Sequence, residues 1–244
     1  MRHHSRGLGL TAAGERFLSD ARSVLARLDD VRGTEGLVQG RVRVGCFVTL
    51  APFVLPELVT LAQDRFPNLE IEIDEGDAFE LGAIVSDGRV ELAVGYGFAF
   101  GAGIRTIPLA ERPLYVLLPA GHRLAGEDAV RLLDLAGGRL VLLDLPHSRD
   151  YFVDMLADAG LRPEILHRAH SYETVRAMGG RGLGFSVLNQ RPALDTTYDG
   201  REVVARPITD DAPSLTVVAA SREAERTSTR ARAALEVLTE SLAS

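Results

Sequence analysis

The fold is decided by a strand–helix–strand stretch that reads Arg41-Val42-Arg43-Val44-Gly45-Cys46-Phe47-Val48-Thr49-Leu50-Ala51-Pro52-Phe53-Val54-Leu55-Pro56 and reaches Leu69-Glu70-Ile71-Glu72-Ile73. Alternation of apolar and polar residues predicts strands at 41–46 and 69–73. The residues between them predict a helix that runs through Phe66 and is closed by Pro67-Asn68. Strand and helix patterns continue to alternate along the chain, which indicates an α/β fold with mainly parallel sheets.

The remaining elements are expected at regular intervals after this stretch. The patterns predict strands at 91–95, 114–118, 140–143, 185–188, 203–208 and 215–220, and helices at 79–85, 129–135, 149–159, 172–181 and 223–242. The glycine-rich run at 179–184 follows a predicted helix and precedes a predicted strand, the reverse of the order that a phosphate-binding loop needs. We interpret that run as a helix stop and a tight turn.

Composition places the chain among soluble globular proteins of one or two domains. It has 244 residues, 46% of them hydrophobic and 25% charged, with a net charge of −7. Neither an apolar run of the ~20 residues that a membrane helix needs nor an apolar signal core is found. The single cysteine, Cys46, fits a reducing compartment, so we expect a cytoplasmic protein. Residues 1–43 have a net charge of +3, with eight arginines and five acidic residues, so the acidity lies in the remainder.

A long helix is expected near the N-terminus. Thr11 is a good N-cap, and Gly33 and Gly36 end the helix. An apolar stripe at alternating spacings of four and three runs along it, at Phe17, Ala21, Val24, Leu28 and Val31. Such a stripe is typical either of an amphipathic helix packed on its own domain or of a helix that pairs with a second subunit.

Several stretches together resemble one protein family, the LysR-type transcriptional regulators. The first 17 residues are similar to the wing and helix start that close the winged helix-turn-helix of that family. The family's effector-binding domain is matched by Gly88-Arg89-Val90-Glu91-Leu92-Ala93-Val94, by residues 114–124 with Arg123 in place of a proline, and by Leu183-Gly184-Phe185-Ser186-Val187-Leu188 with Asn189 in place of a proline. The resemblance covers essentially the whole chain.

The resemblance implies a two-subdomain effector domain like the periplasmic binding proteins of type 2, preceded by a long dimerisation helix. The implied parts are a winged helix-turn-helix remnant at 1–10, a linker helix at 11–36, one subdomain at 41–111 and 214–244, and the other at 112–213. The linker helix would make a homodimer or homotetramer. The recognition helix is expected to be missing from this sequence, so promoter DNA would be a partner of the full-length form only, with Arg2 and Arg6 as the remaining DNA contacts.

Three predicted helix starts offer donors for a small anionic or carboxylated effector in the cleft between the subdomains. They carry Thr49, the run His147-Ser148-Arg149, and Ser171 with Tyr172; Tyr96, after a predicted strand, is a further candidate for the cleft wall. Each hydroxyl could instead be a plain helix cap, and the His147 and Arg149 side chains could face solvent.

No pattern in the sequence predicts catalysis, a metal site or a cofactor. The histidines lack the spacing of a zinc site, Cys46 has no activating neighbour, and no nucleophile-elbow serine occurs. The sequence therefore predicts no enzyme, and the resemblance to the LysR-type family implies a ligand-controlled DNA-binding transcription regulator. The alternative is a cytoplasmic sensory module that pairs with other regulators without binding DNA.

Overall fold

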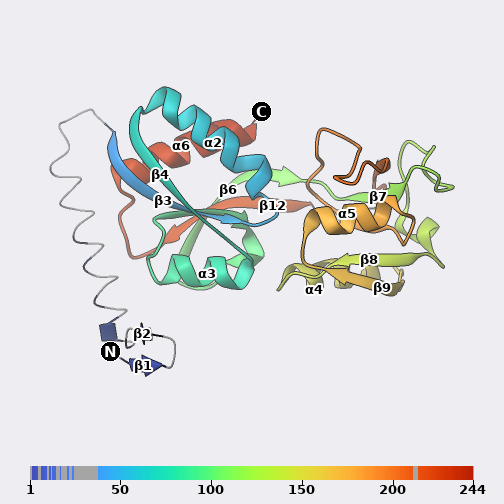
Figure 1. The fold of residues 1–244 in the computed structure, drawn as a ribbon, viewed down its shortest axis with the longest axis horizontal. Helices are drawn as coiled ribbons and strands as arrows, with labels where there is room; N and C mark the ends of the chain where they lie inside the picture. The colour runs from blue at the N-terminus through green and yellow to red at the C-terminus, as the bar shows by residue number, and fades with distance from the viewer. Residues whose placement is uncertain are drawn as a thin grey trace. The chain divides into compact units, whose positions relative to one another are not determined.

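The computed structural model describes residues 38–210 and 214–243, together with 2–4, 7–9, 11, 13, 14, 17, 21 and 24 nearer the N-terminus. The chain divides into two compact units (Figure 1). The first consists of Met1–Ala110 and Val218–Ser244, and the second of Glu111–Val217. The architecture is a mixed α/β fold, as the sequence predicts. No described helix has both the length and the apolar character required to span a bilayer.

The first unit is built on a five-stranded sheet in the order β4-β3-β5-β12-β6. Strand β3 pairs in parallel with both β4 and β5, as the opening strand–helix–strand pattern predicts. The strands are β3 Gln39–Phe47, β4 Asn68–Gly76, β5 Leu92–Tyr96, β6 Ile104–Arg112 and β12 Leu215–Arg222.

Helices cover both faces of this sheet. Helices α2 (Ala51–Arg65) and α6 (Thr229–Ala243) pack on each other on one side, and α3 (Ala78–Ser86) lies on the other (Figure 1). Gly45 lets α3 approach, because a side chain there would come within 2.8 Å of Leu81. Asp77 closes the start of α3 with a capping box, in which its carboxylate accepts from the Glu80 N–H and the Glu80 carboxylate accepts in return.

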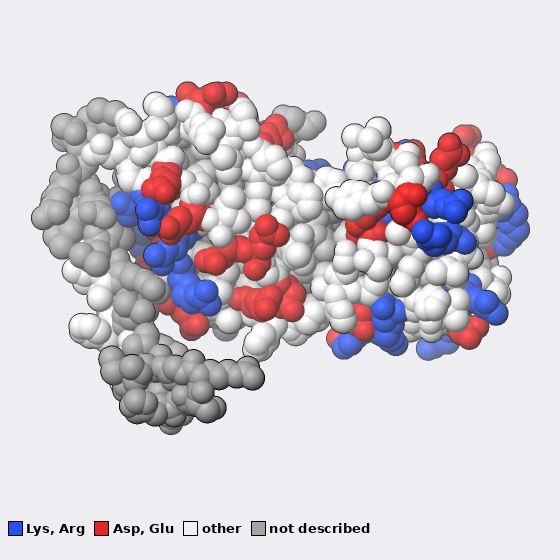
Figure 2. All heavy atoms as spheres, in the orientation of Figure 1, with Lys and Arg blue, Asp and Glu red and all other residues white. Residues whose placement is uncertain are grey.

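A ladder of ion pairs crosses from β3 to the edge strand β4. Arg41 lies opposite Glu70, and Arg43 lies opposite Glu72, in the parallel register. The Arg41–Glu70 and Arg43–Glu72 contacts measure 3.1 and 2.9 Å, and Arg41 also reaches Glu72 at 2.7 Å. Figure 2 shows basic side chains beside acidic ones on this face of the first unit. Two charges of the edge strand, Glu70 and Glu72, are thereby paired across the sheet.

The second unit contains two smaller sheets, and one of them corrects the expectation of mainly parallel pairing. Strand β7 (Tyr115–Pro119) pairs antiparallel with both β10 (Ser186–Leu188) and β11 (Val203–Pro207). Because β7 follows β6 with only two intervening residues and no crossover helix, no connection obliges it to run parallel to its neighbours. The other sheet, β8 (Arg139–Leu143) with β9 (Glu164–Ala169), is parallel.

The helices of the second unit follow these strands. They are α4 (Ser148–Asp158) and α5 (Tyr172–Gly180), with a 3₁₀ helix η2 at Leu132–Leu135 and a further one, η1, at Gly97–Ala99 in the first unit. The predicted helix at 129–135 is therefore wrong in type, since only the four-residue η2 forms there. Strands β6 and β9 were not predicted, because their residues alternate too weakly between apolar and polar types.

The last helix begins later than predicted. Its first residue is Thr229, whereas the pattern predicts a start at 223. Ser228 explains the difference, because its hydroxyl accepts from the Ala231 N–H at 3.1 Å and donates to the Glu91 carboxylate at 2.7 Å. This serine therefore fixes the helix start as a cap.

The N-terminal segment contains a short antiparallel pair, β1 (Arg2–His4) with β2 (Gly7–Gly9). Thr11 acts as predicted, since its hydroxyl accepts from the Gly14 N–H at 3.2 Å. Of the apolar stripe, Phe17 is 74% exposed and Val24 is 55% exposed, and Ala21 is partly exposed. Leu28, Val31 and Arg6 lie outside the described residues, and pairing through this stripe stays a prediction.

Candidate functional site

Two of the predicted helix starts meet at one edge of the second unit. Strands β8 and β9 run in parallel with Leu143 opposite Ala169, and the Asp144 N–H donates to the Ala169 carbonyl at 2.9 Å. Helix α4 follows β8 and helix α5 follows β9, so both helices begin beyond the carboxyl ends of adjacent parallel strands. This edge of an α/β sheet is where small ligands usually bind.

The α4 start contains a strained turn at His147. The φ angle of His147 is +61°, and the Ser148 N–H donates to the Pro146 carbonyl at 2.7 Å across it. This geometry is a γ-turn of the rare type, which a non-glycine residue adopts only under constraint from its surroundings. His147 is exposed and makes no side-chain cap, whereas Ser148 is only 4% exposed as the first residue of the helix.

Arg149, at the start of α4, pairs with two carboxylates. Its guanidinium contacts the Asp144 carboxylate at 3.1 Å and the Asp150 carboxylate at 3.0 Å. Asp144 also pairs with Arg168 of β9 at 3.6 Å, so it ties the end of β8 to both neighbouring segments. Because each guanidinium has a carboxylate beside it, the α4 start has no excess positive charge. The N–H groups of Ser148, Arg149 and Tyr151 also have carbonyl acceptors already.

The α5 start is built differently. Ser171 is the N-cap, and its hydroxyl oxygen accepts from the Thr174 N–H at 3.4 Å, which leaves the hydroxyl proton for another acceptor. Tyr172 is the first residue of the helix and is half-buried. Its hydroxyl lies 2.9 Å from the hydroxyl of Tyr115, on β7, and contacts the Gln190 main-chain carbonyl. The Tyr172 and Tyr115 hydroxyls therefore lie together at the Gln190 carbonyl, apart from the Ser171 cap.

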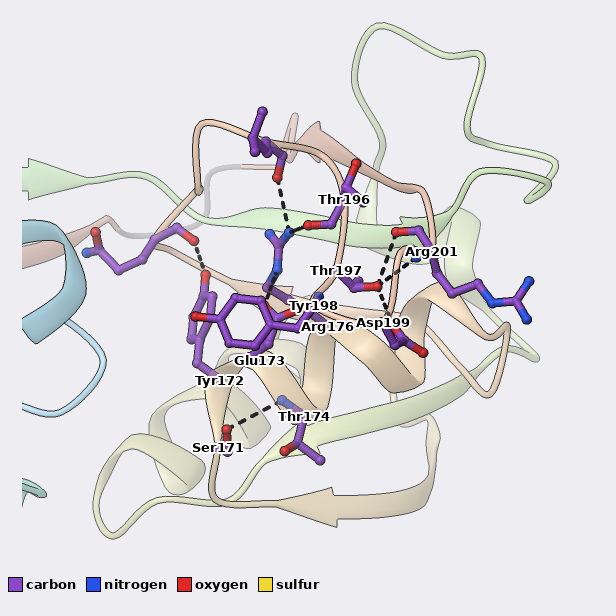
Figure 3. A network of polar contacts seen from close by, with 12 residues as sticks. Ser171, Tyr172, Glu173, Thr174, Arg176, Thr196, Thr197, Tyr198, Asp199 and Arg201 are labelled. Atoms are coloured by element: carbon purple, nitrogen blue, oxygen red, sulfur yellow. Dashed lines mark hydrogen bonds and ion pairs between the residues drawn. The ribbon is translucent and has the colours of Figure 1, made fainter.

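A buried ion pair supports this group from the next turn of α5 (Figure 3). Arg176 is 2% exposed and contacts the Glu173 carboxylate at 2.9 Å. It also donates to the carbonyls of Leu194 and Thr196 at 3.1 and 3.0 Å, and Glu173 accepts from the Tyr198 N–H at 2.6 Å. The pair thus fastens the loop between β10 and β11 to α5.

Tyr115 is the buried member of the hydroxyl group. It is 6% exposed and donates to the Gln190 carbonyl at 2.9 Å. Burial raises the pKa of the Tyr115 hydroxyl, while the hydrogen bond with Tyr172 and the positive charge of Arg176 act in the opposite direction. The hydroxyl is therefore protonated near neutral pH and can serve as a donor.

Thr49 and Tyr96 belong to the first unit, where they follow or end the adjacent parallel strands β3 and β5. Thr49 is 6% exposed and lies in the turn before α2, whose N-cap is Leu50 with no side-chain cap bond. Tyr96 is buried, with its ring 5.2 Å from that of Phe47 and 5.5 Å from that of Phe98. Thr49 is thus not the helix cap, and Tyr96 belongs to an aromatic cluster.

The sequence patterns did not indicate three of the residues that shape the second unit's site. Asp144, Tyr115 and Arg176 come from separate elements and form no motif with the predicted residues. Tyr115 and Tyr172 are 57 positions apart, a separation that no local spacing can predict. Among the described residues, no group of three or more histidine, cysteine or carboxylate side chains could hold a metal ion.

Comparison with known proteins assigns the chain to a family. A family model described as the LysR substrate binding domain matches residues 35–243. The crystal structure of HinK, a LysR family transcriptional regulator from Pseudomonas aeruginosa, superposes with a TM-score of 0.82 at 35% identity, over 96% of this chain and 81% of that one. The hydrogen peroxide-inducible genes activator of Pectobacterium carotovorum is 29% identical over 78% of this chain. The dual regulator OxyR of Escherichia coli is 28% identical over 78%. The chain spans 64% and 63% of these two relatives.

Proposed function

Because this chain belongs to the LysR substrate-binding domain family, which consists of transcriptional regulators and not of enzymes, we propose that it is the sensory part of a regulator controlled by a small anionic or carboxylated effector. The α5 start carries this proposal. The Ser171 hydroxyl keeps a proton to donate there, at the carboxyl edge of β8 and β9, and Tyr172 follows it as the first residue of the helix. Carboxylate oxygens accept several hydrogen bonds at once and suit such a donor.

The arginine charge at this edge would not by itself attract an anionic effector. The carboxylates of Asp144 and Asp150 balance Arg149. Affinity would therefore come from oriented hydroxyl donors, with Ser148 and the exposed His147 as further contacts on the α4 side. The participation of Thr49 and Tyr96 from the first unit stays a prediction.

We do not propose that this chain senses peroxide through a thiol, because its cysteine is buried. The named relatives include hydrogen peroxide-inducible activators, but the only cysteine of these 244 residues is Cys46. Cys46 is 0% exposed within β3, and burial raises the pKa of its thiol. The thiolate is the reactive form, so burial of this kind makes a cysteine inert.

Titration calorimetry with small acids and their amides tests the proposal. Formate, succinate and benzoate would be compared with formamide, succinamide and benzamide, which have similar shapes and no charge. We expect at least one acid to bind while its amide does not. Binding of amides alone, or of none of the acids, would contradict an anionic effector.

We also propose that two copies pair through the helix that starts near Thr11. The exposure of Phe17 and Val24, 74% and 55%, supports pairing over packing of the stripe on its own unit. A paired regulator with DNA-binding parts would transmit effector binding to promoter DNA as a shift between two arrangements. The same pairing helix would serve a sensory module that joins other regulators without binding DNA.

A further inference from the structure

A polar cavity of about 370 Å³ lies in the first unit, beside the loop that joins β12 to α6 (Figure 1). Three arginines line it, namely Arg105 from β6, Arg226 from the loop and Arg232 from the first turn of α6. Its volume lies within the range of about 300–1,000 Å³ that is usual for small-molecule sites. The cavity therefore has room for a small ligand.

This cavity is separate from the effector site proposed above. A Cβ atom at Gly40, the second residue of β3, would lie 3.5 Å from the Arg230 side chain, so α6 begins near the amino end of β3. Thr49 and Tyr96 lie at the carboxyl ends of β3 and β5, and the α5 start belongs to the second unit. A ligand beside α6 would therefore occupy a second site.

The three arginines of the cavity have donors to spare. Arg105 donates to the main-chain carbonyl of Glu223 at 3.1 Å, and Arg232 donates to the Thr229 hydroxyl at 3.2 Å. Within the described part of the chain, neither of them has a carboxylate within ion-pair distance, and Arg226 has no side-chain partner at all. Each guanidinium carries five N–H donors, so most of the donors here are not used by the protein.

Two glutamates also line the cavity, and they differ in their partners. The Glu225 carboxylate pairs with Arg222. The Glu223 carboxylate is exposed and forms no ion pair with a described residue, while its main chain is fixed by the Arg105 bond and by an N–H bond to the Gly103 carbonyl at 2.9 Å. Three guanidiniums against one uncompensated carboxylate leave two positive charges at this place.

These charges come from side chains and not from the start of α6. The Ser228 hydroxyl accepts from the Ala231 N–H, and the Ser228 carbonyl accepts from the Arg232 N–H, so the helix start already has acceptors of its own. Guanidinium groups match phosphate oxygens with pairs of parallel hydrogen bonds. A phosphate monoester carries close to two negative charges near neutral pH and offers three acceptor oxygens. Its charge and its acceptors fit the cavity better than a carboxylate does.

We propose that this cavity is a second ligand site, which takes the phosphate group of a small phosphate monoester through Arg105, Arg226 and Arg232. The doubly charged monoester is favoured over anions with a single charge, such as carboxylates and phosphate diesters. Glu223 opposes binding by its own negative charge and so limits the affinity.

Methyl phosphate is the probe, because it is the simplest phosphate monoester. Dimethyl phosphate and acetate, each with one negative charge, are titrated beside it at constant ionic strength. Backbone amide signals of the whole chain, labelled with nitrogen-15, locate and measure the binding. The variants are Arg105→Gln, Arg226→Gln and Glu223→Gln. Arg162→Gln is the matched control, because Arg162 is also exposed and makes no ion pair with a described residue, and it lies in the second unit.

We expect methyl phosphate to shift the amide signals of residues 223–227. Arg226→Gln should weaken its binding about fivefold, as the loss of one exposed ion pair would. Arg105→Gln should weaken it similarly, whereas Glu223→Gln should strengthen it. Arg162→Gln should bind as the unchanged protein does. Since Arg226 has no side-chain partner among the described residues, its replacement disturbs no contact in the fold.

Three results would overturn the inference. Equal binding of dimethyl phosphate or acetate would show that the cavity does not select a doubly charged group. Unchanged affinity in Arg226→Gln and Arg105→Gln, or no gain in Glu223→Gln, would show that these charges do not hold the ligand. If methyl phosphate shifts signals around Ser171 and none at 223–227, it binds at the α5 start, and the inference fails while the proposed function stands.

Discussion

Replacing Arg176 with methionine should destabilise the second unit more than any exposed arginine replacement. The side chain is 2% exposed and makes one ion pair, with Glu173 at 2.9 Å, and two hydrogen bonds to main-chain carbonyls. Methionine fills a similar volume but donates nothing, so a carboxylate and two carbonyls would lose their donor. Removing one partner of a buried pair costs about 3–5 kcal/mol. Glu173 is 20% exposed and can be partly hydrated, so we expect a loss of about 3 kcal/mol.

Urea unfolding followed by far-ultraviolet circular dichroism measures this loss. With a denaturant slope of about 2 kcal/mol per molar for a unit of this size, the midpoint should fall by about 1.5 M. Arg181→Met is the matched control, because Arg181 lies at the end of the same helix, is 52% exposed and pairs with Asp199. Its midpoint should change by less than about 0.3 M, as expected of a surface pair.

A small effect would refute this reasoning. If the midpoint for Arg176→Met lay within the error of that for Arg181→Met, the Arg176–Glu173 pair would not hold the loop to α5. The loop carbonyls would then have to be satisfied by water, and hydrogen exchange of the Tyr198 N–H, which donates to Glu173, would be fast in both variants.

Three other changes test separate parts of the structure. Val24→Asp combined with Leu28→Asp should lower the mass measured by light scattering if the stripe pairs two copies, and an unchanged mass in a dimeric protein would reject that pairing. Gly184→Ala should destabilise the protein by about 1–3 kcal/mol in the same urea assay, because its new Cβ would lie 2.5 Å from the Arg139 carbonyl oxygen; an unchanged midpoint would contradict the close approach. The pKa of Glu111 is lowered because two hydroxyls donate to it, so its contribution to stability is present above its unfolded pKa and lost as the pH falls through the lower folded value. Glu111→Gln should therefore flatten the acid branch of stability against pH, and an identical branch would show that the bonds do not matter.

Local sequence patterns predicted the helix starts that form the site but not the partners of its side chains. The α5 start was predicted because a capping serine is followed by a helical run in the sequence, and both signals act over a few residues. The same logic predicted the α4 start to within one residue. Strand β9 was missed because most of its residues are only half-buried, and such a strand has no clear alternation.

The partners of the site residues depend on the assembled fold. Arg149 was predicted as a candidate contact for an anionic effector, yet Asp144 and Asp150 already accompany it, and only the pairing of β8 with β9 brings Arg168 to Asp144 as well. Tyr115 reaches Tyr172 because β7 and α5 pack together, a contact that neither segment encodes alone. The local sequence therefore predicts which residues lie at a helix start. It does not predict which carboxylates neutralise an arginine or which hydroxyls share a hydrogen bond.

The ion-pair ladder on β4 also bears on how the protein behaves at high concentration. Strand β4 is nine residues long and forms one edge of the sheet among the described residues, and an edge of this length can recruit strands from other molecules. Glu70 and Glu72 place charge on that edge, and ion pairs with Arg41 and Arg43 restrict the two glutamate side chains. Like charges on two approaching edges repel, so the ladder acts as a barrier to self-association. Threonine at both glutamates would keep the strand and weaken that barrier, leaving Asp74 and Glu75 as the acidic residues of β4, and the variant should turn cloudy at concentrations where the unchanged protein stays clear.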